Sequence, residues 1–158
     1  MQYVIRVIGR EVEDPDGEFV NVRVLIEEPE TGLHPNAISA VLLLILDLLA
    51  RGYRVCLSTH SPHILDVVWA LRVIRENRAP ASRILELFDT RETLPMRKMA
   101  EDVLAKTARV YYFEREAGVA RDISNLDPGS DEAVEAGWGG LSEFSGRVAD
   151  VVAKVVAA

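Results

Sequence analysis

Two strand-like apolar runs alternate with two helix-like segments between residues 22 and 73, and this alternation limits the fold more than any other feature of the sequence. Each strand-like run is short and ends at a polar cluster, whereas each helix-like segment has a proline at its start. The four segments are, in chain order, Val22–Ile26, Asn36–Arg51, Tyr53–Ser58 and Pro62–Val73. A strand, a helix and a second strand in this order form a βαβ unit, so we expect the two strands to be parallel.

The ends of both helices carry residues that favour helix starts and stops. Pro35 and Pro62 stand at first helical positions, where the missing N–H is not needed, and Ser61 is a suitable N-cap. Gly52 follows the first helix, where a cap with a left-handed backbone is common. Because Asn36–Arg51 is almost wholly apolar, we expect this helix to be covered on most sides.

A β-hairpin is expected before this unit. Tyr3–Val12 and Glu18–Ile26 are rich in β-branched residues, and Pro15-Asp16-Gly17 lies between them. Proline fixes φ, aspartate bonds its own backbone and glycine accepts positive φ, so this tripeptide favours a tight turn. The pattern therefore predicts that the two runs pair with each other.

The carboxyl-terminal half is expected to add a helix over Pro95–Thr107 and a second antiparallel pair, Arg109–Glu114 with Val119–Ser124. Leu141–Ala157 has apolar residues at helical spacing, which predicts an amphipathic helix that packs on the core. Trp138 stands among glycines and is expected at the surface.

The composition is typical of one folded domain. The chain has 158 residues, of which 49% are hydrophobic, so it is long enough to bury a core and too apolar to be disordered. No repeat or long linker divides it. We therefore expect a single domain over residues 1–158, of the α/β class, with a mostly parallel sheet, flanking helices and antiparallel hairpin additions.

Charge and cysteine content exclude several classes of protein. The net charge of −7 argues against a chain that wraps bare nucleic acid, because phosphate binding needs a basic surface. The single cysteine, Cys56, excludes an internal disulfide and is typical of a reducing compartment. The first residues do not resemble a secretory signal, and no apolar run reaches the roughly 20 residues of a membrane span. We expect a soluble, cytoplasmic protein.

Polar clusters follow both strands of the βαβ unit. Glu27, Glu28 and Glu30 follow the first strand, and Thr59 and His60 end the second. In a parallel sheet ligands bind at the carboxyl ends of the strands, so we expect these clusters to face one ligand. Adjacent carboxylates suit a hard cation and a proton-accepting base, while histidine suits the oxygens of a transferring phosphoryl group.

The two clusters carry a resemblance to a known family. The segment V-L-I-E-E-P-E-T-G-L-H-P, residues 24–35, resembles the Walker B strand and D-loop of ABC-type ATPase heads. The nearest branch contains DNA-repair ATPases, overcoming-lysogenisation-defect proteins and related AAA-type proteins. The segment L-S-T-H-S-P, residues 57–62, resembles their switch-histidine loop and follows at the expected distance.

The resemblance assigns a role to each matching residue. Glu27 corresponds to the acid that holds Mg²⁺, Glu28 to the catalytic base and His60 to the histidine that contacts the γ-phosphate. A further group of nucleotide-contacting residues is implied. It comprises Thr31, Gly32 and His34 in the D-loop, which in the family crosses to an opposing head, together with Thr59.

Three of the family's nucleotide-binding motifs are missing from the sequence. A phosphate cradle of the form G-x-x-x-x-G-K-[ST] is absent, since none of the ten glycines is followed by lysine. Gln2 is the only glutamine, so no Q-loop is present, and no signature motif precedes the first strand of the βαβ unit. The chain therefore corresponds to the carboxyl-terminal half of a head, and Mg²⁺ and ATP are expected as cofactors only where the site is completed.

Three functions remain open at this point. The chain contributes to an ATP hydrolase completed by another chain or a longer parent; or it is a degenerate head that acts as an interaction module; or it is a metal-dependent phosphoesterase. In the last case His34 and His63 would join the glutamates. We expect either self-association or a partner that carries Walker A, no membrane partner, and contact with nucleic acid only through a complex.

Overall fold

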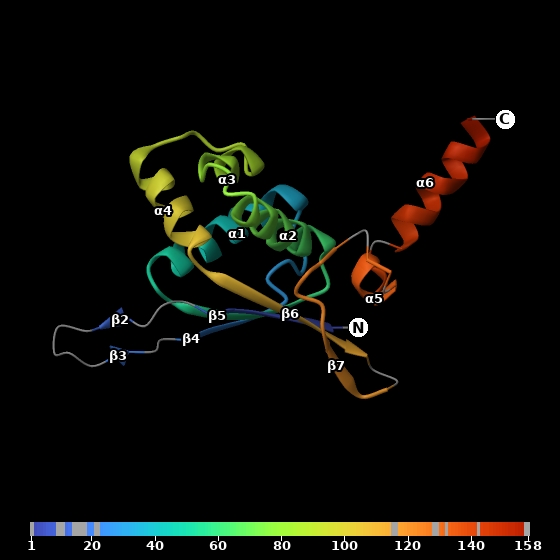
Figure 1. The fold of residues 1–158 in the computed structure, drawn as a ribbon, viewed down its shortest axis with the longest axis horizontal. Helices are drawn as coiled ribbons and strands as arrows, with labels where there is room; N and C mark the ends of the chain where they lie inside the picture. Colours follow the sequence, from blue (N-terminus) through green and yellow to red (C-terminus); the bar gives the residue numbers. More distant parts are fainter. Residues whose placement is uncertain are drawn as a thin grey trace.

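A five-stranded sheet organises the molecule, with its strands in the order β4-β5-β1-β6-β7 (Figure 1). The computed structural model describes residues 2–8, 12–13, 19–20, 23–114, 117–127, 130–131, 133–141 and 143–156. The strands are β1 (Gln2–Ile8), β2 (Val12–Glu13), β3 (Phe19–Val20), β4 (Arg23–Glu27), β5 (Arg54–Thr59), β6 (Thr107–Glu114) and β7 (Val119–Asp122). The helices are α1 (Pro35–Ala50), α2 (Pro62–Glu76), α3 (Ser82–Leu87), α4 (Leu94–Leu104), α5 (Ala133–Ala136), the 3₁₀ turn η1 (Trp138–Gly140) and α6 (Glu143–Val156).

The α/β class and the parallel βαβ unit are confirmed. β4 and β5 are direct neighbours and pair in parallel, from Arg23 beside Arg54 to Glu27 beside Ser58. The parallel part of the sheet is smaller than expected, because the pairings of β1 with β5, β1 with β6 and β6 with β7 are all antiparallel. The β6–β7 pair agrees with the antiparallel hairpin predicted from the sequence.

The predicted amino-terminal hairpin is only partly correct. β2 and β3 do pair, through Val12 with Val20 and Glu13 with Phe19, but they form a separate two-stranded sheet. β1 instead lies between β5 and β6, and β4 pairs with β5. A local turn signal reports only the nearest pairing, whereas β1 joins strands that are distant in the sequence. The turn tripeptide at 15–17 lies outside the described residues.

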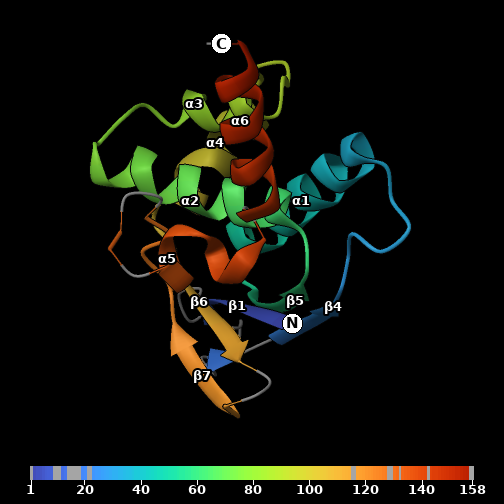
Figure 2. The same cartoon turned by 90° about the vertical axis from the view of Figure 1, so that its right-hand side faces the viewer.

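The helices α1, α2, α3 and α4 all lie on one side of the sheet (Figures 1 and 2). Alternate residues of β4 show the result, since Val24 and Ile26 pack on the core while Leu25 is 79% exposed. The core lies between the sheet and the helices. Its most deeply buried apolar side chains are Val55, Ile64, Leu65, Ile84, Val110 and Leu126.

Capping residues at the ends of α1 fix the directions in which the chain enters and leaves the helix. His34 is the N-cap and accepts a hydrogen bond from the Asn36 N–H on Nδ1 at 3.3 Å. At the other end Gly52 has φ +95°, and the Gly52 and Tyr53 N–H groups bond the last carbonyls of the helix. This paired arrangement is a Schellman cap, which only a residue that tolerates positive φ accommodates easily.

Two expectations for the carboxyl-terminal segment are wrong. Trp138 is buried rather than exposed; its ring centroid lies 6.4 Å from that of Trp69, and its indole N–H donates to the Leu126 carbonyl. The closing helix α6 forms, but it extends away from the helical layer (Figure 1), and its described valines do not pack on the core. Its apolar stripe is exposed at Val148, Val151, Val152 and Val155.

In the parts of the chain that the structure describes, none of the helices combines the length and the apolar character that a membrane crossing requires.

Candidate functional site

The polar clusters that follow β4 and β5 lie side by side. The parallel pairing of the two strands continues one step beyond β4, because the Glu28 N–H donates to the Ser58 carbonyl at 3.0 Å. Both clusters are therefore delivered to the same edge of the sheet, as the carboxyl ends of parallel strands require. This confirms the expectation that they face a common site.

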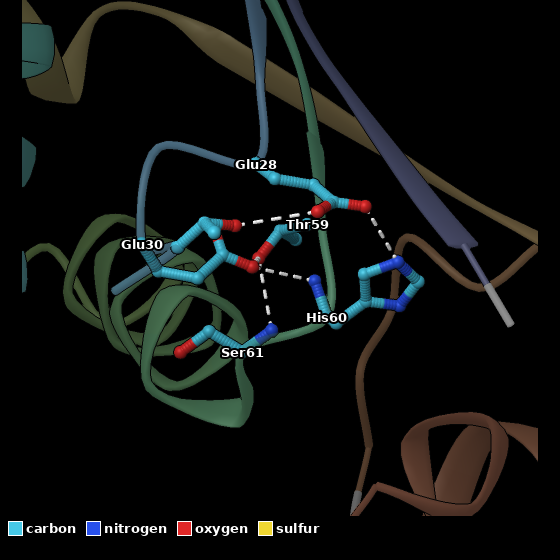
Figure 3. Close-up of polar contacts among 6 residues, drawn as sticks. Glu28, Glu30, Thr59, His60 and Ser61 are labelled. Atoms are coloured by element: carbon cyan, nitrogen blue, oxygen red, sulfur yellow. Dashed lines mark hydrogen bonds and ion pairs between the residues drawn. The ribbon is translucent and has the colours of Figure 1, made fainter. Parts of the chain in front are cut away.

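Glu28 and His60 form the central contact of this site. The His60 Nε2 atom lies 2.8 Å from Glu28 Oε1 (Figure 3). An ionised carboxylate only accepts hydrogen bonds, so at this distance it favours the imidazole tautomer that carries its proton on Nε2. The side chain of His60 is 44% exposed and that of Glu28 is 36% exposed, which leaves both within reach of a ligand.

The backbone at Glu28 is held in an uncommon conformation. Its φ of +42° lies in the left-handed region, which costs a non-glycine residue about 1–2 kcal/mol. The turn that follows stabilises it, since the Thr31 N–H donates to the Glu28 carbonyl at 3.0 Å and the Thr31 hydroxyl donates to Glu28 Oε2 at 3.3 Å. Strained residues of this kind cluster at functional sites, because they aim a side chain that an extended strand would direct elsewhere.

Glu27 lies on the open face of the sheet, where it is exposed. Ser58 is its register partner on β5, and the Ser58 hydroxyl oxygen is buried with no hydrogen-bond partner among the described residues. Two hard oxygen donors therefore stand beside each other at the strand ends. Magnesium in nucleotide sites is commonly held by one or two protein oxygens plus phosphate and water, so this donor pair fits it in part. Among the described residues no cluster of three His, Cys, Asp or Glu side chains could hold a metal alone.

The three residues that the sequence predicted as a D-loop, Thr31, Gly32 and His34, are all exposed in the loop between β4 and α1. Gly32 has φ +74°, and a Cβ there would meet nothing within 4 Å, so the backbone conformation and not crowding favours glycine. His34 serves as the N-cap of α1. The loop is therefore well ordered by local hydrogen bonds and presents its residues to solvent.

Thr59 is completely buried, unlike the other predicted site residues. Its hydroxyl donates to Glu30 Oε1 at 2.6 Å and accepts from the Ser61 N–H at 2.9 Å (Figure 3). Glu30 Oε1 also accepts from the His60 N–H at 2.6 Å. The sequence analysis grouped Glu30 with the other glutamates and did not predict its bonds to the second loop. The only signal in the sequence for a separate role was its position two residues after Glu28, beyond a proline.

His63 lies apart from the Glu28–His60 pair. Its Nε2 atom is 3.1 Å from the Ser39 hydroxyl, so it joins the first turns of α1 and α2. Both His34 and His63 thus have partners of their own in the helix starts.

Comparison with known proteins finds similarity over the segment that carries the two polar clusters. The profile of a family described as "AAA domain, putative AbiEii toxin, Type IV TA system" matches residues 24–66. These residues run from β4 to the first turns of α2, so they contain both polar clusters and the helix between them.

A curated relative is similar over part of this chain. The chain is 36% identical over 63 residues to the protein named "Old nuclease" from Escherichia phage P2. The similar region is 40% of this chain and 11% of that protein, so the chain spans a small part of the length of its relative. No solved structure matches the chain significantly. Together the two matches make part of this chain similar to an AAA domain and to the Old nuclease.

Proposed function

We propose that this chain supplies the metal-binding and water-activating half of an ATP-hydrolysing site, which another polypeptide or a longer parent protein completes. The observation that carries the proposal is the Glu28–His60 contact at the ends of two neighbouring parallel strands. The family match over residues 24–66 covers the same two strands. In this proposal β4 is a Walker B strand and the loop after β5 is a switch-histidine loop.

Each side chain has a distinct task in the completed site. Glu27 would hold Mg²⁺, directly or through water, with the Ser58 hydroxyl beside it, and the ion would neutralise charge on phosphate oxygens. Glu28 would take the proton of the attacking water. His60 would donate its Nε2 proton to an oxygen of the transferring phosphoryl group. Thr31, Gly32 and His34 are exposed and suited to contact an opposing subunit.

The Glu28–His60 contact suggests how a bound nucleotide would make Glu28 available as the general base. In the free chain the carboxylate is occupied by the imidazole. A phosphoryl oxygen that accepts the His60 proton takes the place of the carboxylate and leaves Glu28 free to accept from water. The base would then become available only when a phosphoryl group is in position, which limits wasteful proton transfer.

The missing phosphate cradle determines the experiment. Backbone N–H groups and a lysine provide much of the grip on triphosphate in this class, and the 158 residues contain no such loop. Calorimetry should therefore detect no appreciable binding of Mg-ATP to the chain alone. Hydrolysis should appear when the chain is combined with a protein from an adjacent gene that carries G-x-x-x-x-G-K-[ST].

A matched pair of variants makes this test specific. Glu28→Gln should abolish hydrolysis by the combination, whereas Glu76→Gln should not, because Glu76 pairs with Arg72 on the surface of α2. Low-micromolar binding of ATP by the chain alone would contradict the proposal. So would hydrolysis that survives Glu28→Gln.

One observation favours a second candidate function, that of a degenerate head acting as an interaction module. The exposed valines of α6 form an apolar stripe that the described part of this chain does not cover. This function becomes the leading candidate where no combination hydrolyses ATP. The phosphoesterase alternative is less well supported, since His34 and His63 bond the starts of α1 and α2 and do not join the glutamates.

A further inference from the structure

A single carboxylate oxygen joins the two loops of the site. Glu30 belongs to the loop after β4, and its Oε1 accepts hydrogen bonds from the Thr59 hydroxyl and from the His60 N–H, both at 2.6 Å (Figure 3). The donors are the last residue of β5 and the residue that follows it, 29 and 30 residues further along the chain. Short bonds to an ionised acceptor are about twice as strong as neutral ones.

These bonds fix the backbone from which the His60 imidazole extends. The Thr59 hydroxyl is buried, and it also accepts a hydrogen bond from the Ser61 N–H at 2.9 Å, so Glu30 is linked through Thr59 to Ser61. Ser61 is the N-cap of α2, yet its own side chain makes no capping bond. The turn from β5 into α2 is therefore held by Glu30 and Thr59, and His60 stands in the middle of that turn.

The two glutamates of the loop point to different sides of this turn. Glu28 meets the imidazole of His60, whereas Glu30 meets its backbone (Figure 3). His60 is thus fixed at both ends by carboxylates from the same loop. The second oxygen of Glu30, Oε2, is buried and has no partner among the described residues. One oxygen therefore makes both bonds.

We propose that Glu30 is a positioning residue that holds His60 in reach of Glu28 and of the ligand. Its effect on turnover rests on the proposed function, while its effect on His60 does not. For this positioning, the reach of the Glu30 acceptor oxygen to both donors matters more than the negative charge of the side chain.

Two conservative variants separate reach from charge. Glu30→Gln keeps the length and an acceptor oxygen while it removes the charge, and it places the amide nitrogen where Oε2 makes no bond. Glu30→Asp keeps the charge but shortens the side chain by one methylene, so that the acceptor no longer reaches both donors. Glu86→Asp is the matched control, because it shortens an exposed glutamate that bonds Arg83 far from the site.

The first measurement uses the full chain without nucleotide. Amide hydrogen exchange of His60 should accelerate about tenfold in Glu30→Asp, which loses the charge-assisted hydrogen bond. It should accelerate about threefold in Glu30→Gln, which keeps a weaker bond to a neutral acceptor, and stay unchanged in Glu86→Asp. The ring ¹⁵N shifts of His60 should move away from the Nε2-protonated form in Glu30→Asp only. Exchange at Val110, which donates to Ser124, reports whether the fold is intact. Equal protection of His60 in Glu30→Asp and the wild type would overturn the proposal, as would equal loss in both Glu30 variants.

The second measurement uses the combination that hydrolyses ATP. Glu30→Asp should lower kcat about tenfold with nucleotide affinity within about threefold, and Glu30→Gln should restore most of the turnover. A loss of affinity with kcat unchanged would overturn the positioning role. Exchange data as expected with no hydrolysis in any combination would leave the positioning of His60 intact and reject the ATPase function instead.

Discussion

Glu28 and His60, from the ends of two different strands, lie 2.8 Å apart before any nucleotide is present. Their pairing depends on the direct parallel contact of β4 with β5, which a sheet with an intervening strand would have prevented. In the proposed site, a bound nucleotide would have to open this contact. Substitutions at these positions therefore test the proposed chemistry directly.

Glu28→Gln should abolish most turnover of the completed site while it preserves nucleotide affinity. The amide keeps the size of the side chain and still positions water, but it cannot take the proton, so we expect kcat to fall by about 10²–10⁴-fold. Steady-state hydrolysis and equilibrium binding, measured side by side, check this. A variant that keeps most of the wild-type rate would show that Glu28 is not the base.

Glu27→Gln should behave differently, because the proposed task of Glu27 is to hold the metal. We expect both a lower rate and a higher Mg²⁺ concentration for half-maximal hydrolysis, since a neutral amide is a weaker ligand for a hard cation. Titration of hydrolysis with Mg²⁺ for the two variants separates their roles. Identical Mg²⁺ curves for Glu27→Gln and the wild type would remove Glu27 from the metal site.

Leu65→Ala should destabilise the fold by about 2–5 kcal/mol, because Leu65 of α2 is fully buried and its truncation leaves a cavity. The control is Leu94→Ala, which shortens a leucine that is 82% exposed at the start of α4 and should change stability by less than about 0.5 kcal/mol. Urea unfolding of both variants measures the difference. Equal losses would mean that the core does not lie where the structure puts it.

Asp122 should make stability fall at low pH. Hydrogen bonds from Ser124, with a smaller contribution from Arg109, lower the pKa of this carboxyl below its usual value. A carboxyl whose folded pKa is depressed adds stability above its unfolded pKa, and that stability is lost as pH falls through the folded pKa. Asp122→Asn should therefore be less stable than the wild type at about pH 7 and approach it at about pH 2. Thermal unfolding at both pH values checks the sign; a difference that grows on acidification would contradict it.

The α6 stripe should promote self-association, because valines at helical spacing suit a second identical helix. Light scattering should detect oligomers of the wild-type chain at high concentration, and the double variant Val151→Glu, Val155→Glu should reduce them. Val119→Glu, at an exposed valine on β7, is the control. A wild-type chain that stays monomeric at every concentration would argue for a self-contained domain.

Local signals in the sequence were sufficient for the elements that build the site. Pro35 and Pro62 start helices α1 and α2, and Gly52 ends α1 with the positive φ that a glycine accepts. Such features act within one turn of chain, so they do not depend on distant packing. The strand–helix–strand order then required β4 and β5 to be parallel, which brought Glu28 and His60 to one edge.

Those local signals could not predict which strands, distant in the sequence, pair with each other. The turn tripeptide predicted that the first strand pairs with its neighbour in sequence, but β1 lies between β5 and β6. Trp138, expected at the surface from its glycine neighbours, is buried beside Trp69 of another helix. For β1 the pairing with distant strands overrides the local turn signal, and for Trp138 apolar burial against a remote residue overrides local preference.

The sequence by itself thus determined the βαβ unit and the residue types at its two strand ends, because both follow from short-range sterics and from spacing along the chain. Only the tertiary structure decided which contacts each glutamate makes. Glu28, with φ +42°, meets the imidazole, and Glu30 turns to the buried Thr59 hydroxyl and the His60 backbone. Nothing in the letters E-E-P-E distinguishes them, since the distinction arises from the hydrogen-bond donors that the second loop brings within reach.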